Sequence, residues 1–336
     1  MIITRTPFRM SFFGGGTDFK EYYEEYGGTV LSSTFDKYCF INVRHLPNFF
    51  EYRTHLTYSK TEYVSAFDEI HHPLIREAMR YLDIHDIRLI YDADLPARTG
   101  IGTSSAFAVG LLNAFYALKG KRIDKKRLSE EAIYIERELC LEYGGIQDQI
   151  AAAYGGMNRI DMNETGWSVS PLVISSQRLI ELNSRLMLFF TGFTRTSSDV
   201  QKNVTKKIKD NVSYLNEMKS MVDEAVKVLE SNKSMAEFGK LLHHTWMLKR
   251  RLSENISNAH IDSVYEVALK AGATGGKILG AGNGGFMLFY VDEDRQDDVK
   301  KALKELMHVP FAFESDGTQV IYYDTEEYVP RLAMLS

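Results

Sequence analysis

The feature that most constrains the fold is a turn rich in glycine and hydroxyl side chains, residues 95–107, which reads LPARTGIGTSSAF. Residues 87–91 before it have the short apolar pattern of a strand, whereas residues 106–118 after it are apolar and favour a helix. Such a turn presents free backbone N–H groups at a helix N-terminus, where the helix dipole attracts anions. Gly100 and Gly102 let the backbone approach an oxygen closely, because neither carries a Cβ. The pattern therefore predicts a phosphate-binding loop.

Two familiar nucleotide-binding motifs do not fit the chain. A Walker A loop requires lysine after its last glycine, and Thr103 follows Gly102 here. Residues 280–285 match the dinucleotide-binding fingerprint as a string, but residues 286–291 have a strand pattern where that fold requires a helix. The chain is therefore predicted to be neither a P-loop enzyme nor a Rossmann protein. A glycine turn without any ligand stays open as an alternative.

The composition of the 336-residue chain is that of an ordinary globular protein. Its 44% hydrophobic content can bury a substantial core, and its formal net charge of −5 argues against a nucleic-acid partner. No stretch has the pattern of a membrane span or a signal peptide, and two cysteines fit a reducing compartment. We expect a cytoplasmic protein with small-molecule partners and with no nucleic-acid or membrane partner. The oligomeric state stays open, because the surface helices lack a sustained heptad pattern.

The order of the expected elements predicts an α+β protein with two domains. Strands are expected within residues 2–12, 29–59, 87–91, 186–191, 286–291 and 319–323, and helices within 19–26, 74–82, 106–118, 128–141, 147–154, 199–231, 235–253, 261–271 and 295–307. A stretch of low periodicity, residues 160–183, contains Gly166 and Pro171. We therefore place the domain boundary near residue 180, which gives domains 1–180 and 181–336.

Two further glycine-rich motifs lie near the two ends of the chain. Residues 6–18 read TPFRMSFFGGGTD and present Thr17 and Asp18 just before a helix, and residues 275–285 read GGKILGAGNGG. Each also has an ordinary structural interpretation. An aspartate before a helix often caps it, and a glycine ribbon often only turns the chain.

Together and in this order, the three motifs resemble those of the GHMP kinases, the family of galactokinase, homoserine kinase and mevalonate kinase. Residues 7–18 match the N-terminal motif, 96–105 the central Pro-x-x-x-Gly-Leu-Gly-Ser-Ser-Ala motif, and 280–285 the motif Gly-Ala-Gly-x-Gly-Gly. Three ordered matches are far more specific than one. The resemblance implies an N-terminal domain like domain 2 of ribosomal protein S5, with the ATP phosphate loop and the catalytic base. It also implies a ferredoxin-like α+β C-terminal domain that closes over the substrate.

Within this family the chain is most similar to the branch that acts on D-glycero-D-manno-heptose 7-phosphate. The similarity is carried by residues 14–18, 102–105, 147–155, 191–198 and 246–249. Galactokinases have Glu and His where this chain has Gly15 and Gly16, and the two glycines leave room for a larger substrate. The resemblance implies ATP-dependent phosphorylation of the anomeric hydroxyl, which gives the 1,7-bisphosphate for nucleotide-activated heptose synthesis. A fucokinase- or galactokinase-like sugar 1-kinase and a non-catalytic sugar and ATP sensor are the alternatives.

The resemblance also implies roles for single residues. Asp148 matches the catalytic aspartate, and Arg9 matches the basic residue that keeps its carboxylate ionised. Ser104 and Glu136 match the ligands of Mg²⁺, with Glu138 as the alternative to Glu136. The ATP phosphates are assigned to Pro96, Gly100, Ile101, Gly102, Thr103, Ser104 and Ser105, and the substrate to Gly16, Thr17, Asp18, Arg195, Gly280, Ala281 and Gly282.

Several of these assignments rest on limited grounds. Arg195 is interpreted as the partner of the 7-phosphate, because a guanidinium fork binds phosphate through two hydrogen bonds. Asp18 and Asp148 could each instead cap a helix, and Glu136 could instead be an ordinary exposed helix residue. The adenine is assigned to residues 52–67 by family topology alone.

Overall fold

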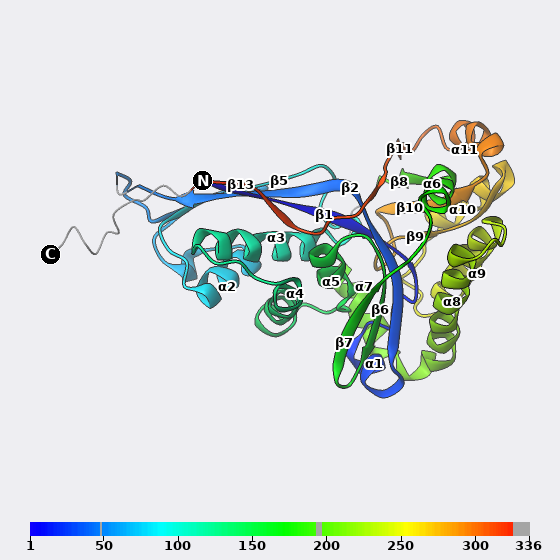
Figure 1. Cartoon of the computed structure of the whole chain (residues 1–336), viewed down its shortest axis with the longest axis horizontal. Coiled ribbons are helices and arrows are strands. Elements are labelled where there is room, and N and C mark those ends of the chain that lie inside the picture. The colour runs from blue at the N-terminus through cyan, green and yellow to red at the C-terminus, as the bar shows by residue number, and fades with distance from the viewer. Residues whose placement is uncertain (48, 193–196, 325–336) are drawn as a thin grey trace.

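Two β-sheets organise the chain in the computed structural model, which describes residues 1–47, 49–192 and 197–324 (Figure 1). The nine-stranded sheet contains β1 (Ile2–Phe13), β2 (Gly28–His45), β3 (Thr54–Thr57), β4 (Thr61–Val64), β5 (Ile87–Ala93), β6 (Met157–Asn163), β7 (Gly166–Pro171), β12 (Phe313–Glu314) and β13 (Gln319–Tyr323). The four-stranded sheet contains β8 (Leu186–Phe190), β9 (Ala273–Ile278), β10 (Phe286–Val291) and β11 (Met307–Val309).

The helices fall into a group on the large sheet and a second group that lies partly against the large sheet and partly against the small one (Figure 1). The first group is α1 (Lys20–Tyr26), α2 (Pro73–Leu82), α3 (Thr103–Leu118), α4 (Lys125–Tyr134) and α5 (Gln147–Tyr154). The remaining helices are α6 (Ser176–Arg185), α7 (Ser197–Lys206), α8 (Val212–Glu230), α9 (Ala236–Lys249), α10 (Ala259–Ala271) and α11 (Gln296–Ala302). Single turns of 3₁₀-helix lie at Phe67–Glu69, Lys209–Asn211 and Glu293–Arg295, and a π-helical turn at Ile135–Leu139.

The long strand β2 is the centre of the large sheet. One edge of it pairs antiparallel with β1, while the other edge pairs with β5 through residues 39–45 and with β6 through residues 28–33. Helices α2 to α5 cover one face of this sheet (Figure 1), and α3 packs against both β1 and β2. The loop that connects β5 to α3 therefore emerges beside β1, where the N-terminal motif runs.

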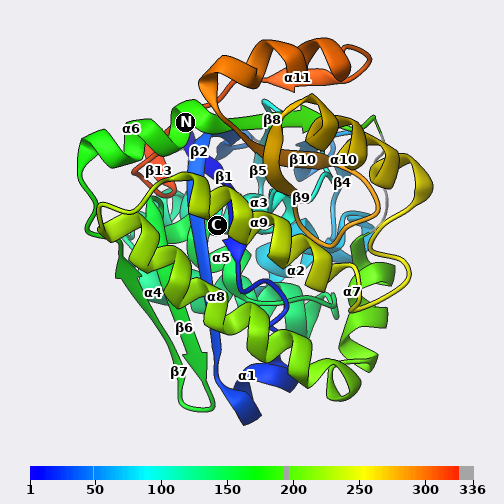
Figure 2. The ribbon, with the colours of Figure 1, turned by 90° about the vertical axis from the view of Figure 1, so that its right-hand side faces the viewer.

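Strand β1 alternates between buried and half-buried side chains over residues 2–5, and all its side chains are buried from Thr6 to Phe13. The alternation ends because α8 and α9 cross the second half of the strand on the face opposite α3 (Figure 2). Phe12 and Phe13 contact Phe238 of α9 edge-to-face, with ring centroids 5.5 and 5.1 Å apart. One hydrophobic core therefore runs from the large sheet to the small one.

The C-terminal part of the chain returns to the large sheet. Strand β13 pairs antiparallel with β1, and the short strand β12 pairs with β2. The division at residue 180 is therefore wrong for residues 313–323, which the sequence analysis placed in the second domain. Hydrophobic periodicity identified β13 as a strand, but it carries no information about which sheet offers the free edge.

Three other expectations differ from the structure. Residues 160–183, expected without regular structure, form the β6–β7 hairpin and the start of α6. The long helix expected over 199–231 is broken at Lys209–Asn211, and the helix expected to reach residue 307 ends at Ala302, so that Met307 can begin β11.

In the described part of the chain, no helix combines the length and apolarity that crossing a membrane requires.

Candidate active site

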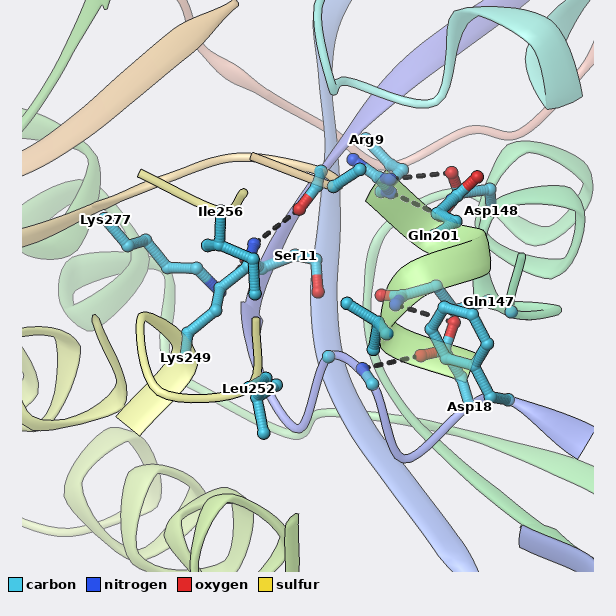
Figure 3. Close-up of a pocket in the computed structure, with 17 residues that line it drawn as sticks. Arg9, Ser11, Asp18, Gln147, Asp148, Gln201, Lys249, Leu252, Ile256 and Lys277 are labelled. Atoms are coloured by element: carbon cyan, nitrogen blue, oxygen red, sulfur yellow. Dashed lines mark hydrogen bonds and ion pairs between the residues drawn. The ribbon is translucent and has the colours of Figure 1, made fainter. Parts of the chain in front are cut away.

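A pocket lies where the two sheets meet, and the N-terminal and C-terminal glycine-rich motifs both contribute to its lining (Figure 3). Its space is about 650 Å³, including the part open to solvent. Its lining comes from β1 and the turn after it, the start of α5, and the C-terminal half of the chain: Arg9, Ser11, Gly15, Gly16, Asp18, Phe19, Gly145, Gln147, Asp148, Gln201, Val204, Lys249, Leu252, Ile256, Lys277, Gly280 and Ala281. Segments more than 200 residues apart in the sequence therefore share one cavity.

Arg9 and Asp148 form an ion pair through two hydrogen bonds at this pocket. Arg9 Nε donates to Asp148 Oδ1 at 2.7 Å, and Arg9 Nη2 donates to Oδ2 at 2.6 Å. Arg9 Nη1 also donates to the carbonyl of Gly100 at 2.7 Å, so the same guanidinium ties the carboxylate to the glycine loop. Asp148 lies in the first turn of α5 with its carboxylate on Arg9. Its position does not support the capping alternative.

The central glycine loop leads into α3 as the sequence pattern predicted. Gly102 occupies the N-cap position with φ 75°, and no described side chain caps this helix start. A Cβ on Gly102 would lie 3.5 Å from Asp148 Oδ2, so the aspartate sits directly against the loop. Of the residues assigned to the ATP phosphates, Ser104 is exposed, whereas Ile101, Thr103 and Ser105 are buried. The side chain of Ser105 is therefore buried, so its assignment to the ATP phosphates concerns its backbone.

The third glycine motif packs against this loop. A Cβ on Gly280 would lie 2.3 Å from the Cα of Gly100, and one on Gly285 would lie 2.1 Å from the carbonyl oxygen of Thr99. Gly280 and Ala281 line the pocket, as the substrate assignment requires. Gly282 does not, because it lies against Ile256, whose carbonyl oxygen would be 2.5 Å from its Cβ. Glycine is needed at these positions to let two backbones touch.

Ser104 and Glu136 meet although 32 residues separate them. Ser104 Oγ donates to Glu136 Oε1 at 2.8 Å, and Gln149 Nε2 donates to Oε2 at 2.5 Å. Glu136 lies in the π-helical turn, in which the amide of Cys140 donates to the carbonyl of Ile135. The Glu136 side chain is buried, whereas Glu138 is exposed. Of the two glutamates, Glu136 is therefore the one that meets Ser104.

Asp18 is buried in the pocket wall and does not cap α1. Its carboxylate accepts from the amide of Gly16 at 2.9 Å and from Gln147 Nε2 at 2.8 Å. Burial, and to a lesser degree the nearby Asp148 carboxylate, raises the pKa of Asp18. The residue before α1 is Phe19, and no described side chain caps that helix. Gly16 and Asp18 therefore remain candidates for binding substrate.

Two of the substrate assignments are not supported by the structure. Thr17 is fully buried, and its hydroxyl donates to the carbonyls of Gly14 and Thr29 while it accepts from the amide of Thr29. Thr17 thus holds the turn together, and neither Thr17 nor Gly282 is among the residues that line the pocket. Arg195 lies outside the described residues.

Two buried lysines line the pocket and were given no role by the sequence analysis. Lys249, at the end of α9, donates to the carbonyls of Ile278 and Gly280, and Lys277 of β9 donates to those of Ser11 and Phe12 at 2.8 Å each. Lys277 thereby ties the small sheet to β1. The signal for Lys277 was weak, because it lies within a glycine-rich segment, and its partners are backbone groups 265 and 266 residues away in the sequence.

Lys249 is expected to make stability depend on pH. Burial, and then the charge of Arg9, lowers its pKa from 10.5 to about 7. In the unfolded chain the lysine keeps its proton to about pH 10, so between pH 7 and 10 the unfolded state binds more protons, and stability rises with pH. Lys249→Met removes this contribution. The free energy of unfolding, measured by urea titration, should rise less steeply from pH 7 to 10 in the variant; equal slopes would contradict the shift.

Comparison with known proteins agrees with this arrangement. The profile of the GHMP kinases N-terminal domain matches residues 69–156, and that of the GHMP kinases C-terminal domain matches residues 216–309. The chain belongs to the GHMP kinase family. It is thus a kinase that uses ATP, and the predicted family, enzyme class and two-domain fold are confirmed.

Individual relatives place the chain among sugar kinases. It is 32% identical over 95% of its length to the D-glycero-alpha-D-manno-heptose 7-phosphate kinase of Campylobacter jejuni, of which it covers 98%. A D-glycero-D-manno-heptose 1-phosphate kinase structure from Bacteroides thetaiotaomicron is similar with a TM-score of 0.79 and 26% identity, covering 97% of this chain and all of that one. The L-fucokinase/L-fucose-1-P guanylyltransferase of Bacteroides fragilis is 27% identical over 71% of this chain, but the match covers only 25% of the length of that protein.

Proposed function

We propose that the protein transfers the γ-phosphoryl group of ATP to the anomeric hydroxyl of a sugar, with D-glycero-D-manno-heptose 7-phosphate as the acceptor and the 1,7-bisphosphate as the product. The full-length similarity to the Campylobacter enzyme supports this acceptor. The name of the Bacteroides structure specifies a heptose 1-phosphate instead, so the position of phosphorylation is part of the proposal.

The observation that carries the proposal is the contact between a carboxylate and the phosphate loop. Asp148 lies against Gly102 at the start of α3, and Arg9 binds both the carboxylate and the Gly100 carbonyl. A γ-phosphate at the helix N-terminus and an acceptor hydroxyl in the pocket would therefore meet beside Asp148. This juxtaposition is what phosphoryl transfer requires of the protein.

Within this proposal, Asp148 is the general base. Its carboxylate accepts the proton of the acceptor hydroxyl while the oxygen of that hydroxyl forms a bond to the γ-phosphorus, and the bond from phosphorus to the ADP oxygen breaks. Arg9 orients the carboxylate with two hydrogen bonds. Asp18 and Gln147 line the same pocket and would position the acceptor.

Ser104 and Glu136 fit the requirements of Mg²⁺ bound to ATP. They would supply one hydroxyl and one carboxylate oxygen, the hard ligands that the ion prefers, beside the ATP phosphates and waters. The ion would neutralise phosphate charge during transfer.

The metal assignment predicts a specific loss in Glu136→Gln. ATP affinity is measured by calorimetry with and without MgCl₂, and in the wild type the metal should increase it. In the variant this increase should be smaller by a factor of about ten, which corresponds to about 1.4 kcal/mol of binding free energy. Glu138→Gln, an exposed neighbour in the same turn, is the control and should bind like the wild type. An unchanged metal dependence in Glu136→Gln would remove the residue from the site.

The proposed function is tested by ADP release with Mg-ATP and a panel of acceptors: D-glycero-D-manno-heptose 7-phosphate, the corresponding 1-phosphate, mannose, galactose, fucose and sedoheptulose 7-phosphate. Turnover of the heptose 7-phosphate, with a second phosphorus resonance coupled to the anomeric proton, is the expected result. Preference for fucose or galactose would overturn the acceptor and favour the free-sugar alternative. Binding without turnover of any acceptor would favour the sensor.

A further inference from the structure

The two buried lysines leave the pocket with more cations than carboxylates. Its lining contains five charged residues, Arg9, Asp18, Asp148, Lys249 and Lys277. Asp148 is already paired with Arg9, and Asp18 accepts two hydrogen bonds from uncharged groups. Within the part of the chain that the structure describes, neither lysine has a carboxylate partner. Because buried charges in proteins are normally paired, this pocket suits an anionic ligand.

Lys249 has an N–H group left for such a ligand. An ammonium group carries three donors, and Lys249 uses two of them on the carbonyls of Ile278 and Gly280. Its side chain is 9% exposed, whereas that of Lys277 is only 2% exposed. Figure 3 shows the Lys249 side chain directed toward the side of the pocket where Arg9 lies. Lys249 is therefore the lysine placed to reach a bound anion.

Gly280 holds the Lys249 ammonium group beside the phosphate loop. Gly280 packs so closely on this loop that its Cβ would lie 2.3 Å from the Cα of Gly100. Arg9 donates to the carbonyl of Gly100 and also binds Asp148. The charges of Arg9 and Asp148 both act on Lys249. A phosphoryl group that moves from the loop toward Asp148 would therefore come within reach of the lysine.

We propose that Lys249 is a catalytic residue that donates a hydrogen bond to the phosphoryl group during its transfer. The inference rests on the proposed function, because it takes transfer beside Asp148 as given, and it holds for whichever acceptor the enzyme uses. Negative charge is spread over the phosphoryl oxygens in the transition state, and a positioned cation stabilises it. Lys249 keeps its proton throughout, so Asp148 remains the base.

The first experiment compares Lys249→Met with the wild type, since methionine has a similar shape without the charge or the donors. We expect kcat to fall about 10²–10³-fold, the effect of removing one positioned donor. The dissociation constant of ADP, which lacks the transferred group, and the KM for the acceptor should stay the same. An unchanged kcat would overturn the proposal. A higher acceptor KM with unchanged kcat would also overturn it, because it would place Lys249 on the acceptor.

Lys219→Met is the matched control for a structural role. Lys219 of α8 also donates to two backbone carbonyls, those of Tyr26 and Gly27, but it does not line the pocket. The control should therefore keep the wild-type kcat. Equal losses of kcat in both variants, or a loss of ADP affinity as large as the loss of kcat in Lys249→Met, would show that Lys249 acts only by holding the backbone.

The pH dependence tests the charge of Lys249 in the unaltered enzyme. Burial, and then the charge of Arg9, lowers its pKa to about 7. Lys277 faces it from β9, Asp18 from the turn after β1, and Asp148 from α5. The value of kcat/KM for ATP reports the free enzyme, so it should fall as the pH rises above about 7 and the lysine loses its proton.

Lys249→Arg should keep most of the activity and lose this decline, because arginine stays charged. The same decline in Lys249→Arg, or no decline in the wild type, would contradict the proposal. The wild-type profile decides the question if neither variant folds.

The two proposals fail separately. Full activity in Asp148→Asn would mean that transfer does not occur beside Asp148, and the role of Lys249 would fall with it. Loss of activity in Asp148→Asn together with full activity in Lys249→Met would remove only the role of Lys249.

Discussion

Replacement of Asp148 by Asn is expected to lower kcat by about 10²–10⁴-fold, the usual contribution of a general base, while ATP affinity changes little. The amide preserves the size of the side chain and one acceptor oxygen for Arg9, but it cannot take up the proton of the acceptor hydroxyl. The measurement is kcat for the best acceptor of the panel, together with the dissociation constant of ATP from calorimetry. Loss of turnover with retained nucleotide binding separates chemistry from folding.

A matched control exists in the same protein. Asp161 forms an ion pair with Arg159 at 2.8 Å in β6, and it does not line the pocket. Asp161→Asn should therefore keep the wild-type kcat, even though it also weakens an arginine–aspartate pair. Full activity in Asp148→Asn would remove this residue as the base and leave the Arg9–Asp148 pair as a structural contact.

Replacement of Gly280 by Ala is expected to destabilise the fold strongly. Two penalties add at this position, the left-handed backbone with φ 66° and a Cβ placed 2.3 Å from the Cα of Gly100. The first costs about 1–2 kcal/mol, and the overpacking about 1–3 kcal/mol more. We expect a loss of about 2–5 kcal/mol in the free energy of unfolding from urea titration. ATP affinity should fall as well, because the central glycine loop must move away from the C-terminal glycine motif that contains Gly280.

Gly120→Ala isolates the steric part of this effect. Gly120 has nearly the same backbone angle, φ 65°, but a Cβ there would meet no described heavy atom within 4 Å. It should lose only the backbone penalty and keep the ATP affinity of the wild type. Equal losses in both variants would show that the contact between the two glycine motifs contributes nothing to stability.

Both predictions concern contacts between segments that are distant in the sequence, and only some of these contacts could be predicted from the sequence. The sequence motifs predicted the phosphate loop, and resemblance to the GHMP kinases predicted Asp148, Arg9, Ser104 and Glu136. The structure then brings Arg9 to Asp148 and Ser104 to Glu136. Sequence spacing did not distinguish Glu136 from Glu138. The π-helical turn did, because it directs one glutamate to Ser104 and leaves the other exposed.

Some assigned residues lie away from the pocket, because a motif says nothing about where each of its side chains points. Thr17 and Gly282 belong to the motifs, yet Thr17 holds a turn together and Gly282 packs against Ile256. Lys277 gave too weak a signal to be assigned, since a single lysine has an ordinary place in most segments. Its backbone partners are supplied only by the folded chain.

The amino-acid sequence by itself determined the local elements and the glycine turns, because hydrophobic periodicity and backbone freedom are properties of neighbouring residues. Tertiary structure alone decided that β13 closes the edge of the first sheet, that two glycine motifs touch, and that two lysines are buried at the pocket. These features depend on which surfaces remain free once the sheets have formed. Burial and partner geometry are long-range quantities, and a linear pattern does not encode them directly.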